Sequence, residues 1–222
     1  MSIERVVADA VAQIDSTHSA REHALTSSRA LTRLCANAIR AVHRGNFTEA
    51  EKLLRDATQT MHNLRESLQE HPGLLFAGYT QDALKEYTEA ALVYAFLHGD
   101  TPPSPIALHV EPAAYLNGLA EAASELRRAI LDKLRHGDVA RGEELLIVMD
   151  EVYSFLITVD YPDAITGGLR RTTDALRAVL ERTRGDMTAA IRQEQLTAAL
   201  AAFERKVSGQ SGDTEATNQF GD

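Results

Sequence analysis

Residues 84–97 read Leu84-Lys85-Glu86-Tyr87-Thr88-Glu89-Ala90-Ala91-Leu92-Val93-Tyr94-Ala95-Phe96-Leu97. This stretch is rich in strong helix formers and contains neither Gly nor Pro. Ala, Leu, Arg and Glu recur at helical spacing along the rest of the chain, whereas alternating runs of β-branched residues do not occur. The sequence therefore predicts an all-α protein.

Breaks in the helical pattern divide the chain into about seven predicted helices. Gly and Pro mark most of these breaks, because Pro lacks the N–H that a helix interior uses and Gly favours turns. The predicted helices span residues 2–44, 48–70, 74–98, 112–135, 139–159, 164–184 and 186–207. The third can be interrupted near Gly78, and Gly185-Asp186 either kinks one long helix or separates the last two.

The first two helices carry more specific signals. Thr48-Glu49-Ala50-Glu51 matches a capping box, in which Thr48 accepts a hydrogen bond from the backbone and Glu51 reaches back. In the first helix, apolar residues recur at helical spacing and are expected to form the stripe that faces the core. These residues are Val6, Val7, Ala10, Val11 and Ile14, followed by Leu25, Leu31, Leu34, Ile39 and Val42.

Length and composition favour one domain. A chain of 222 residues can bury a sizeable core, and 44% hydrophobic and 25% charged residues are typical of a globular protein. We expect this domain to cover residues 1–207. Residues 208–222 are mostly Gly, Ser, Thr, Asn and acidic residues, which predicts a disordered C-terminal tail.

Charge and hydropathy exclude several classes of protein. No apolar stretch approaches the roughly 20 residues needed to cross a bilayer, and the N-terminal segment does not resemble a secretion signal. The single cysteine, Cys35, sits in an apolar helical pattern and is interpreted as a small buried residue, so we expect a cytoplasmic protein with no membrane partner. The net charge of -9 argues against coating nucleic acid with diffuse positive charge, so any phosphate contact must be local.

Four glutamates form two same-face pairs on two predicted helices. Glu86 and Glu89 are three residues apart, and Glu121 and Glu125 are four residues apart. Like charges at these spacings destabilise a helix by roughly a few tenths of a kcal/mol, and no Lys or Arg lies between the members of either pair. A divalent cation such as Mg²⁺, held between two facing helices, would compensate them. The alternative is that both pairs are solvated surface glutamates whose repulsion is screened.

The first predicted helix carries a stripe of arginines at intervals of four, seven and four residues, Arg29, Arg33, Arg40 and Arg44. Such a stripe suits contact with the backbone of a nucleic-acid strand. The alternative is a solvated face that pairs with acids of neighbouring helices. Motifs for other chemistry are missing, since the sequence contains no His-Glu-x-x-His zinc motif and no glycine-rich phosphate loop.

Three segments resemble the translin family, and specifically its Trax-like branch of archaeal type. Ser28-Arg29-Ala30-Leu31-Thr32 resembles the first-helix segment of the family. Leu84-Lys85-Glu86-Tyr87-Thr88-Glu89-Ala90 resembles the Trax-like signature on the third helix. Pro112-Ala113-Ala114-Tyr115-Leu116-Asn117-Gly118-Leu119 resembles the Pro-x-x-Tyr-Leu-x-Gly-hydrophobic motif on the fourth. The resemblance extends from the first helix to about residue 207.

The resemblance implies a helical bundle of about seven helices that forms a closed homo-oligomer, such as an octamer, and binds single-stranded RNA or DNA. For the Trax-like branch it implies an endoribonuclease that depends on Mg²⁺ or Mn²⁺. The implied catalytic and metal-binding residues are Glu86, Glu89, Glu121 and Glu125, a set that non-cutting translin-type subunits lack. The family commonly has Asp where this chain has Glu121, and the longer side chain shifts the position of the oxygen.

Three hypotheses about function result. The leading one is a metal-dependent endoribonuclease in which the four glutamates bind the ions and the arginines of the first helix hold the RNA strand. The second is a translin-like oligomer that binds nucleic acid without cutting it. The third is an all-α nucleotide pyrophosphohydrolase, although that family expects Glu-x-x-Asp as its second acidic pair.

Overall fold

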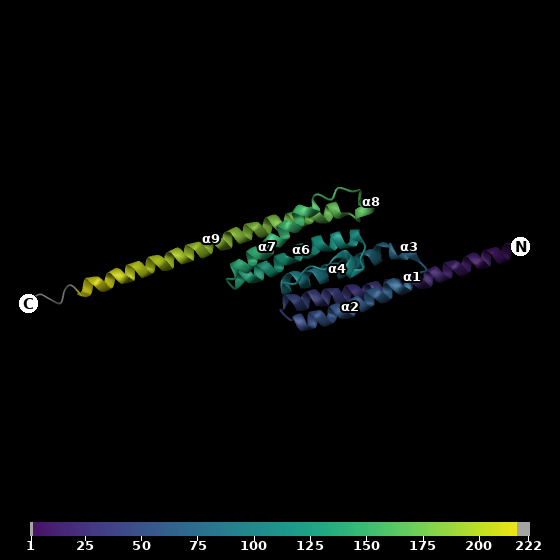
Figure 1. Ribbon diagram of the computed structural model, residues 1–222, viewed down its shortest axis with the longest axis horizontal. Helices are drawn as coiled ribbons and strands as arrows, with labels where there is room; N and C mark the ends of the chain where they lie inside the picture. The colour runs from purple at the N-terminus through teal and green to yellow at the C-terminus, as the bar shows by residue number, and fades with distance from the viewer. Residues whose placement is uncertain (1, 217–222) are drawn as a thin grey trace, which may run out of the picture.

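The computed structural model describes residues 2–216, and the regular structure in that range is entirely helical (Figure 1). The prediction of an all-α fold is confirmed, but the predicted number of helices is wrong, since residues 2–216 form nine helices rather than about seven. They are α1 (Ile3–His43), α2 (Phe47–Ser67), α3 (Pro72–Leu75), α4 (Gly78–His98), α5 (Pro105–Leu108), α6 (Pro112–Arg135), α7 (Val139–Leu156), α8 (Asp163–Thr166) and α9 (Leu169–Ala216).

Two features account for the different number. The single-turn helices α3, α5 and α8 form in the connections between long helices. In α3 and α5 a proline occupies the first turn, where its missing N–H leaves no hydrogen bond unmade. In addition, α9 runs through Gly185 without a break, because one glycine inside a helix costs only about 1 kcal/mol. The predicted sixth and seventh helices are therefore largely one helix.

The bounds of α1, α2, α6 and α7 lie within three residues of those predicted, and α4 begins at Gly78, where the sequence allows an interruption. The predicted capping box of α2 is wrong. Asn46 caps this helix, and its side-chain oxygen accepts a hydrogen bond from the backbone N–H of Glu49 at 3.2 Å. Asn is a better N-cap than Thr, so the helix begins one residue earlier than Thr48.

The helices α4 and α6 lie side by side in the middle of the bundle (Figure 1). On one side α1 and α2 pack against α4, and on the other side α7 and α9 pack against α6. Leu84 of α4 and Leu126 of α6 are completely buried in these contacts. Burial of one such side chain contributes about 1.5–3 kcal/mol. Both central helices are therefore fixed by packing from two directions.

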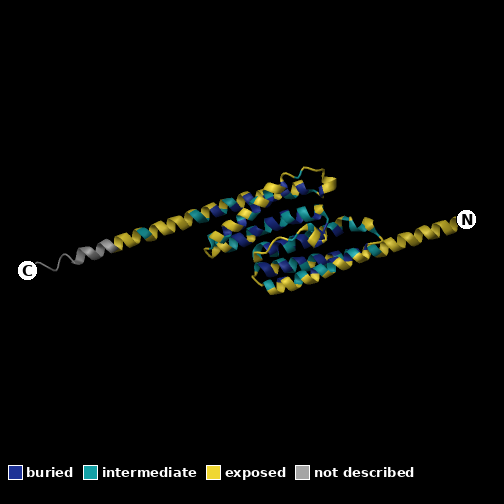
Figure 2. Cartoon of the chain, viewed as in Figure 1, coloured by how far each residue is buried: buried dark blue, intermediate teal, exposed yellow. Residues whose placement is uncertain are grey.

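The two longest helices project from opposite ends of the bundle (Figures 1 and 2). We call residues 3–19 of α1 the N-terminal arm and residues 192–207 of α9 the C-terminal arm; every residue of the first and nearly every residue of the second is exposed. The expectation that the first part of the α1 stripe faces the core is wrong for this chain. Val6, Val7, Val11 and Ile14 are all exposed. The periodicity is helical and apolar, but the other described helices do not cover it.

The end of the chain lies partly outside the described range. The backbone of α9 continues to Ala216, so residues 208–216 of the predicted tail are helical, and residues 217–222 lie outside the described residues. None of the described helices is both long enough and apolar enough to cross a membrane.

Candidate metal centre

The contact between α4 and α6 is very close at Gly118. A Cβ atom at this position would lie 2.7 Å from the carbonyl oxygen of Lys85 and 2.8 Å from the Cβ of Thr88. These distances are too short for any side chain, so only glycine lets the two helices approach this closely. The contact brings the segment 85–89 of α4 next to Glu121, which lies about one turn after Gly118 on α6.

Gly118 belongs to the Pro-x-x-Tyr-Leu-x-Gly segment, and two other residues of this segment hold α6 in place. The hydroxyl of Tyr115 donates to the carbonyl oxygen of Pro103 at 2.8 Å and ties the long connection to the helix. The buried amide of Asn117 donates to the carbonyl oxygen of Thr166 at 2.8 Å and accepts from the hydroxyl of Thr172 at 2.7 Å. The Pro-x-x-Tyr-Leu-x-Gly segment therefore positions the helix that carries Glu121.

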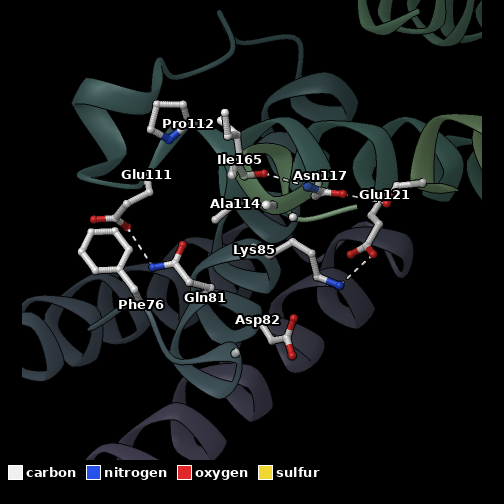
Figure 3. Close-up of a pocket in the computed structure, with 15 residues that line it drawn as sticks. Phe76, Gln81, Asp82, Lys85, Glu111, Pro112, Ala114, Asn117, Glu121 and Ile165 are labelled. Atoms are coloured by element: carbon white, nitrogen blue, oxygen red, sulfur yellow. Dashed lines mark hydrogen bonds and ion pairs between the residues drawn. The ribbon is translucent and has the colours of Figure 1, made fainter. Parts of the chain in front are cut away.

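Three of the four predicted glutamates converge between α4 and α6. One carboxylate oxygen from each of Glu86, Glu89 and Glu121 lies within 4.8 Å of the other two, and all three residues are half-buried. We call these residues the carboxylate cluster. Glu121 accepts from the ammonium group of Lys85 at 2.8 Å (Figure 3). Within the described range, Glu86 and Glu89 have no side-chain hydrogen bond or ion pair, so Glu121 is the one member of the cluster with a described ion-pair partner.

The cluster changes how its members titrate. Burial raises the pKa of Glu89 to about 8, with further increases from the charges of Glu86, Glu121 and Glu125 and a smaller opposing effect of Lys85. Burial also raises the pKa of Glu86 above its ordinary value, although the neighbouring ammonium of Lys85 opposes this. Burial alone would lower the pKa of Lys85, but its hydrogen bond and ion pair with Glu121 raise it. Without a bound cation, Glu89 therefore retains its proton at neutral pH in most molecules.

The fourth glutamate lies against a histidine. Glu125 is not within 4.8 Å of the cluster as a group, and its carboxylate pairs with Nε2 of His43 at 2.7 Å. The side chain of His43 is only 1% exposed, so it holds one oxygen of Glu125 in a fixed position. The charge of Glu125 still contributes to the raised pKa of Glu89. The structure thus separates the predicted set of four into a cluster of three and a neighbouring carboxylate.

Sequence reasoning missed Lys85 and His43. Lys85 directly precedes Glu86, but its partner lies 36 residues away on another helix. His43 lies 82 residues from Glu125 at the end of α1, and no spacing rule connects them. Only the packing of α1 and α4 on α6 could have revealed either contact.

Cys35 lies on the face of α1 that packs behind the cluster. Burial, together with the charges of Glu86 and Glu89, raises the pKa of the Cys35 thiol well above its ordinary value. The thiol is completely buried and stays protonated, as expected of a small apolar side chain. It therefore does not add a thiolate ligand to the cluster.

The four arginines of the predicted stripe are exposed on α1. None of the four forms an ion pair with a described residue, and Arg40 donates only to the side-chain oxygen of Asn37. The alternative of an arginine face that pairs with acids of neighbouring helices is therefore not observed for these residues. No hydrogen bond or ion pair joins them to the carboxylate cluster within the part of the chain that the structure describes.

Comparisons with known proteins place the chain in a family. No family model matches it. An uncharacterized protein of Methanocaldococcus jannaschii is 32% identical over 180 residues, which are 80% of this chain and 79% of the relative. The crystal structure of AfC3PO and the structure of an AfC3PO–duplex RNA complex each have a TM-score of 0.79 and 32% identity, covering 84% of this chain and 97% of the other. This chain belongs to the translin/Trax-like C3PO family.

A more distant C3PO protein shares the fold. Apo-NeC3PO is 19% identical and has a TM-score of 0.74, covering 83% of this chain and 96% of the other. The C3PO fold therefore extends over most of this chain, and the resemblance drawn from the three sequence segments is confirmed.

Proposed function

We propose that this C3PO family member is an RNA-binding, metal-dependent endoribonuclease in which Glu86, Glu89 and Glu121 bind Mg²⁺ or Mn²⁺. The observation that carries the proposal is the convergence of three half-buried carboxylates, two of which have no hydrogen-bonding partner among the described residues. Further support comes from AfC3PO, whose structure in complex with duplex RNA is known and which is 32% identical to this chain.

The carboxylate cluster fits a small divalent cation. An octahedral Mg²⁺ binds oxygen at about 2.0–2.1 Å, so two opposite ligands lie about 4.2 Å apart. Neighbouring ligands of the same ion lie about 3.0 Å apart, and the three oxygens lie within 4.8 Å of one another, so side-chain rotations would have to bring them closer together by up to about 2 Å. All of the donor atoms are oxygen, which Mg²⁺ and Mn²⁺ prefer, and the protonated Cys35 offers no soft ligand that would favour zinc.

A bound ion would polarise the scissile phosphate and lower the pKa of a water molecule. The protein residues prepare the site for this chemistry. A cation held by the cluster would favour the ionised form of Glu89, because it would offset the neighbouring carboxylate charges that help to raise the pKa of Glu89. The ammonium of Lys85 pairs with Glu121 and holds this carboxylate in position beside Glu86 and Glu89. His43 holds Glu125 beside the cluster, and the exposed arginines of α1 attract the RNA backbone.

Cleavage of a labelled RNA tests the proposal. We expect cutting with Mg²⁺ or Mn²⁺, none with EDTA, and a loss of at least about 100-fold in Glu86→Gln, since even partners outside the ligand shell contribute about 10–100-fold. Glu143→Gln is the matched control, because Glu143 is exposed on α7 and outside the cluster. Cleavage that persists in EDTA, or that is equal in the two variants, rules the proposal out. Single-stranded and duplex substrates, each as RNA and DNA, are compared in the same assay.

One observation favours a second candidate function. The ammonium of Lys85 already pairs with Glu121 and offsets part of the charge that would attract a cation. A translin-like protein that binds nucleic acid without cutting it would retain RNA on a filter in a salt-dependent way and leave it intact. The pyrophosphohydrolase hypothesis has no comparable support, because the chain belongs to a different family.

We also propose that the protein works as a homo-oligomer, as the sequence resemblance implies. The N-terminal arm exposes Val7 and Ile14 to the extent of 55% and 66%, and the C-terminal arm exposes Leu200 and Phe203 to the extent of 55% and 65%. In each arm these side chains share one helix face. Exposed apolar stripes on projecting helices are suited to packing against another copy of the chain.

A further inference from the structure

A pocket of about 650 Å³ opens beside the carboxylate cluster, between the first turns of α4 and α6 and the short helix α8 (Figure 3). We call it the α4–α6 pocket. Lys85 and Glu121 line this pocket, and Glu121 also belongs to the cluster. A nucleotide whose phosphate lay at the cluster would therefore have this pocket within reach of its base.

The walls of the pocket are largely apolar and include Pro112, Ala114 and Ile165. At its edge lies the ring of Phe76, which is 65% exposed (Figure 3). An exposed phenylalanine beside a cavity can stack on a nucleobase, and such stacking is worth roughly 1–3 kcal/mol per base. The shape and the apolar lining thus suit a flat aromatic group.

Besides the ammonium of Lys85, which donates to Glu121, two side chains of the pocket have oxygen atoms that accept no hydrogen bond from a described residue. The side-chain nitrogen of Gln81 donates to the carbonyl oxygen of Leu75 at 2.9 Å and to the carboxylate of Glu111 at 3.5 Å, whereas its side-chain oxygen has no donor among the described residues. The carboxylate of Asp82 likewise accepts no side-chain hydrogen bond in the described part of the chain (Figure 3). By contrast, the amide of Asn117 is fully used within the protein. A ligand with N–H donors matches this arrangement.

Charge decides which part of a nucleotide enters. Three carboxylates line the pocket: Glu111 pairs with Arg65 at 2.8 Å, Glu121 pairs with Lys85 at 2.8 Å, and Asp82 has no ion pair among the described residues. The unpaired charge of Asp82 would repel a phosphate, and the lining has no unpaired cation among the described residues to attract one, whereas a neutral base would not be repelled. Adenine, cytosine and guanine carry exocyclic amino groups that donate hydrogen bonds, whereas uracil presents carbonyl oxygens at the corresponding positions.

We propose that the α4–α6 pocket binds the nucleobase next to the scissile phosphate and prefers bases that carry an amino group. Phe76 stacks on the base, and Gln81 and Asp82 accept its amino hydrogens. The position of the phosphate rests on the proposed function, but the recognition of the base does not.

The test uses nucleosides, which need neither a phosphate nor a metal ion. Adenosine, uridine and ribose are titrated into the metal-free full chain and followed by NMR. We expect adenosine to bind more tightly than uridine, and ribose not to bind. Phe76→Ala should weaken adenosine binding at least about fivefold, which is the lower end of the stacking effect. Phe155→Ala is the matched control, because this phenylalanine is also exposed but lies on α7 outside the pocket.

Three further variants separate this inference from the proposed function. Gln81→Ala and Asp82→Ala should reduce the preference for adenosine over uridine, while Glu89→Gln should bind adenosine as the unchanged protein does. The inference is overturned if adenosine binds no better than ribose, or if Phe76→Ala and Phe155→Ala bind it equally. Adenosine binding without metal-dependent RNA cleavage would refute the proposed endoribonuclease but support the nucleobase pocket. Metal-dependent cleavage without adenosine binding would support the endoribonuclease and refute the pocket.

Discussion

The middle of the bundle buries charged side chains, whereas its two arms expose apolar ones. Between α4 and α6, carboxylates are half-buried and two of them have no hydrogen-bonding partner in the described structure. On the arms of α1 and α9, apolar side chains are exposed and no other described helix covers them. Each arrangement is unfavourable in an isolated chain. Both arrangements support the proposals made above, since a cation would offset the charge of the buried carboxylates and a second copy of the chain would cover the exposed apolar stripes.

The largest expected effect is at the middle. Glu89→Gln removes a charge that a cation would need but that destabilises the metal-free fold. We therefore expect RNA cleavage to fall by at least about 100-fold, while the Tm of the metal-free protein at pH 8 rises. Cleavage assays and thermal unfolding of the same preparations measure the two effects. A simultaneous loss of activity and stability would mean that Glu89 has a structural role.

The raised pKa of Glu89 makes the stability of the metal-free protein depend on pH. The pKa of Glu89 is raised to about 8 in the folded protein, so the folded state binds this proton more tightly than the unfolded state does. The contribution of the proton to stability is complete below the unfolded pKa of about 4.5 and is lost as the pH rises through about 8. We expect the Tm of the metal-free protein to fall over this interval, less steeply in Glu89→Gln and less steeply with added Mg²⁺.

The next effect in size concerns the arms. A charge placed on the apolar stripe would have to be buried against the partner, so Ile14→Glu should raise the dissociation constant of the oligomer at least about tenfold. Light scattering across a concentration series measures this. Ala12→Glu adds the same charge on the opposite face of the same arm and should leave the mass unchanged. Equal masses for both variants would exclude this stripe as the contact between copies.

The smallest effect concerns the arginines of α1, which should attract RNA to the middle. Each arginine that contacts a phosphate contributes about one unit to the slope of log affinity against log salt. Arg33→Ala should therefore reduce that slope by about one, with a modest loss of affinity. Arg171→Ala is the control, because Arg171 is an exposed arginine on α9. Filter binding across a salt series would contradict the assignment if both variants kept the full slope.

Local spacing predicted much of the cluster. The interval of three residues between Glu86 and Glu89 places them on one face of α4, and this relation needs no tertiary information. The interval of four residues likewise places Glu121 and Glu125 on one face of α6. It does not reveal that Glu121 lies beside the glutamates of α4, whereas Glu125 pairs with His43 of α1. Those outcomes depend on how three helices pack, which a helical period does not contain.

The arms show that helical periodicity is equally unable to predict which apolar residues are buried within the chain. Val7 and Ile14 have the spacing of a core stripe, and Leu31 further along α1 has it too and is completely buried. The period predicts that an apolar face will be covered, but it does not say whether the cover belongs to the same chain. The capping residue of α2 was predicted incorrectly for a local reason, since two suitable N-cap residues, Asn46 and Thr48, lie two positions apart.

The contact at Gly118 also bears on ion selectivity. The distance between α4 and α6 is set there by the absence of a side chain, and Glu121 follows about one turn later on the same helix. A methyl group at this position would force the two helices apart and widen the cluster. Because Ca²⁺ binds oxygen at about 2.3–2.6 Å and Mg²⁺ at about 2.0–2.1 Å, a wider cluster would favour the larger ion. For the proposed metal centre, we therefore expect glycine at position 118 to favour Mg²⁺ over Ca²⁺.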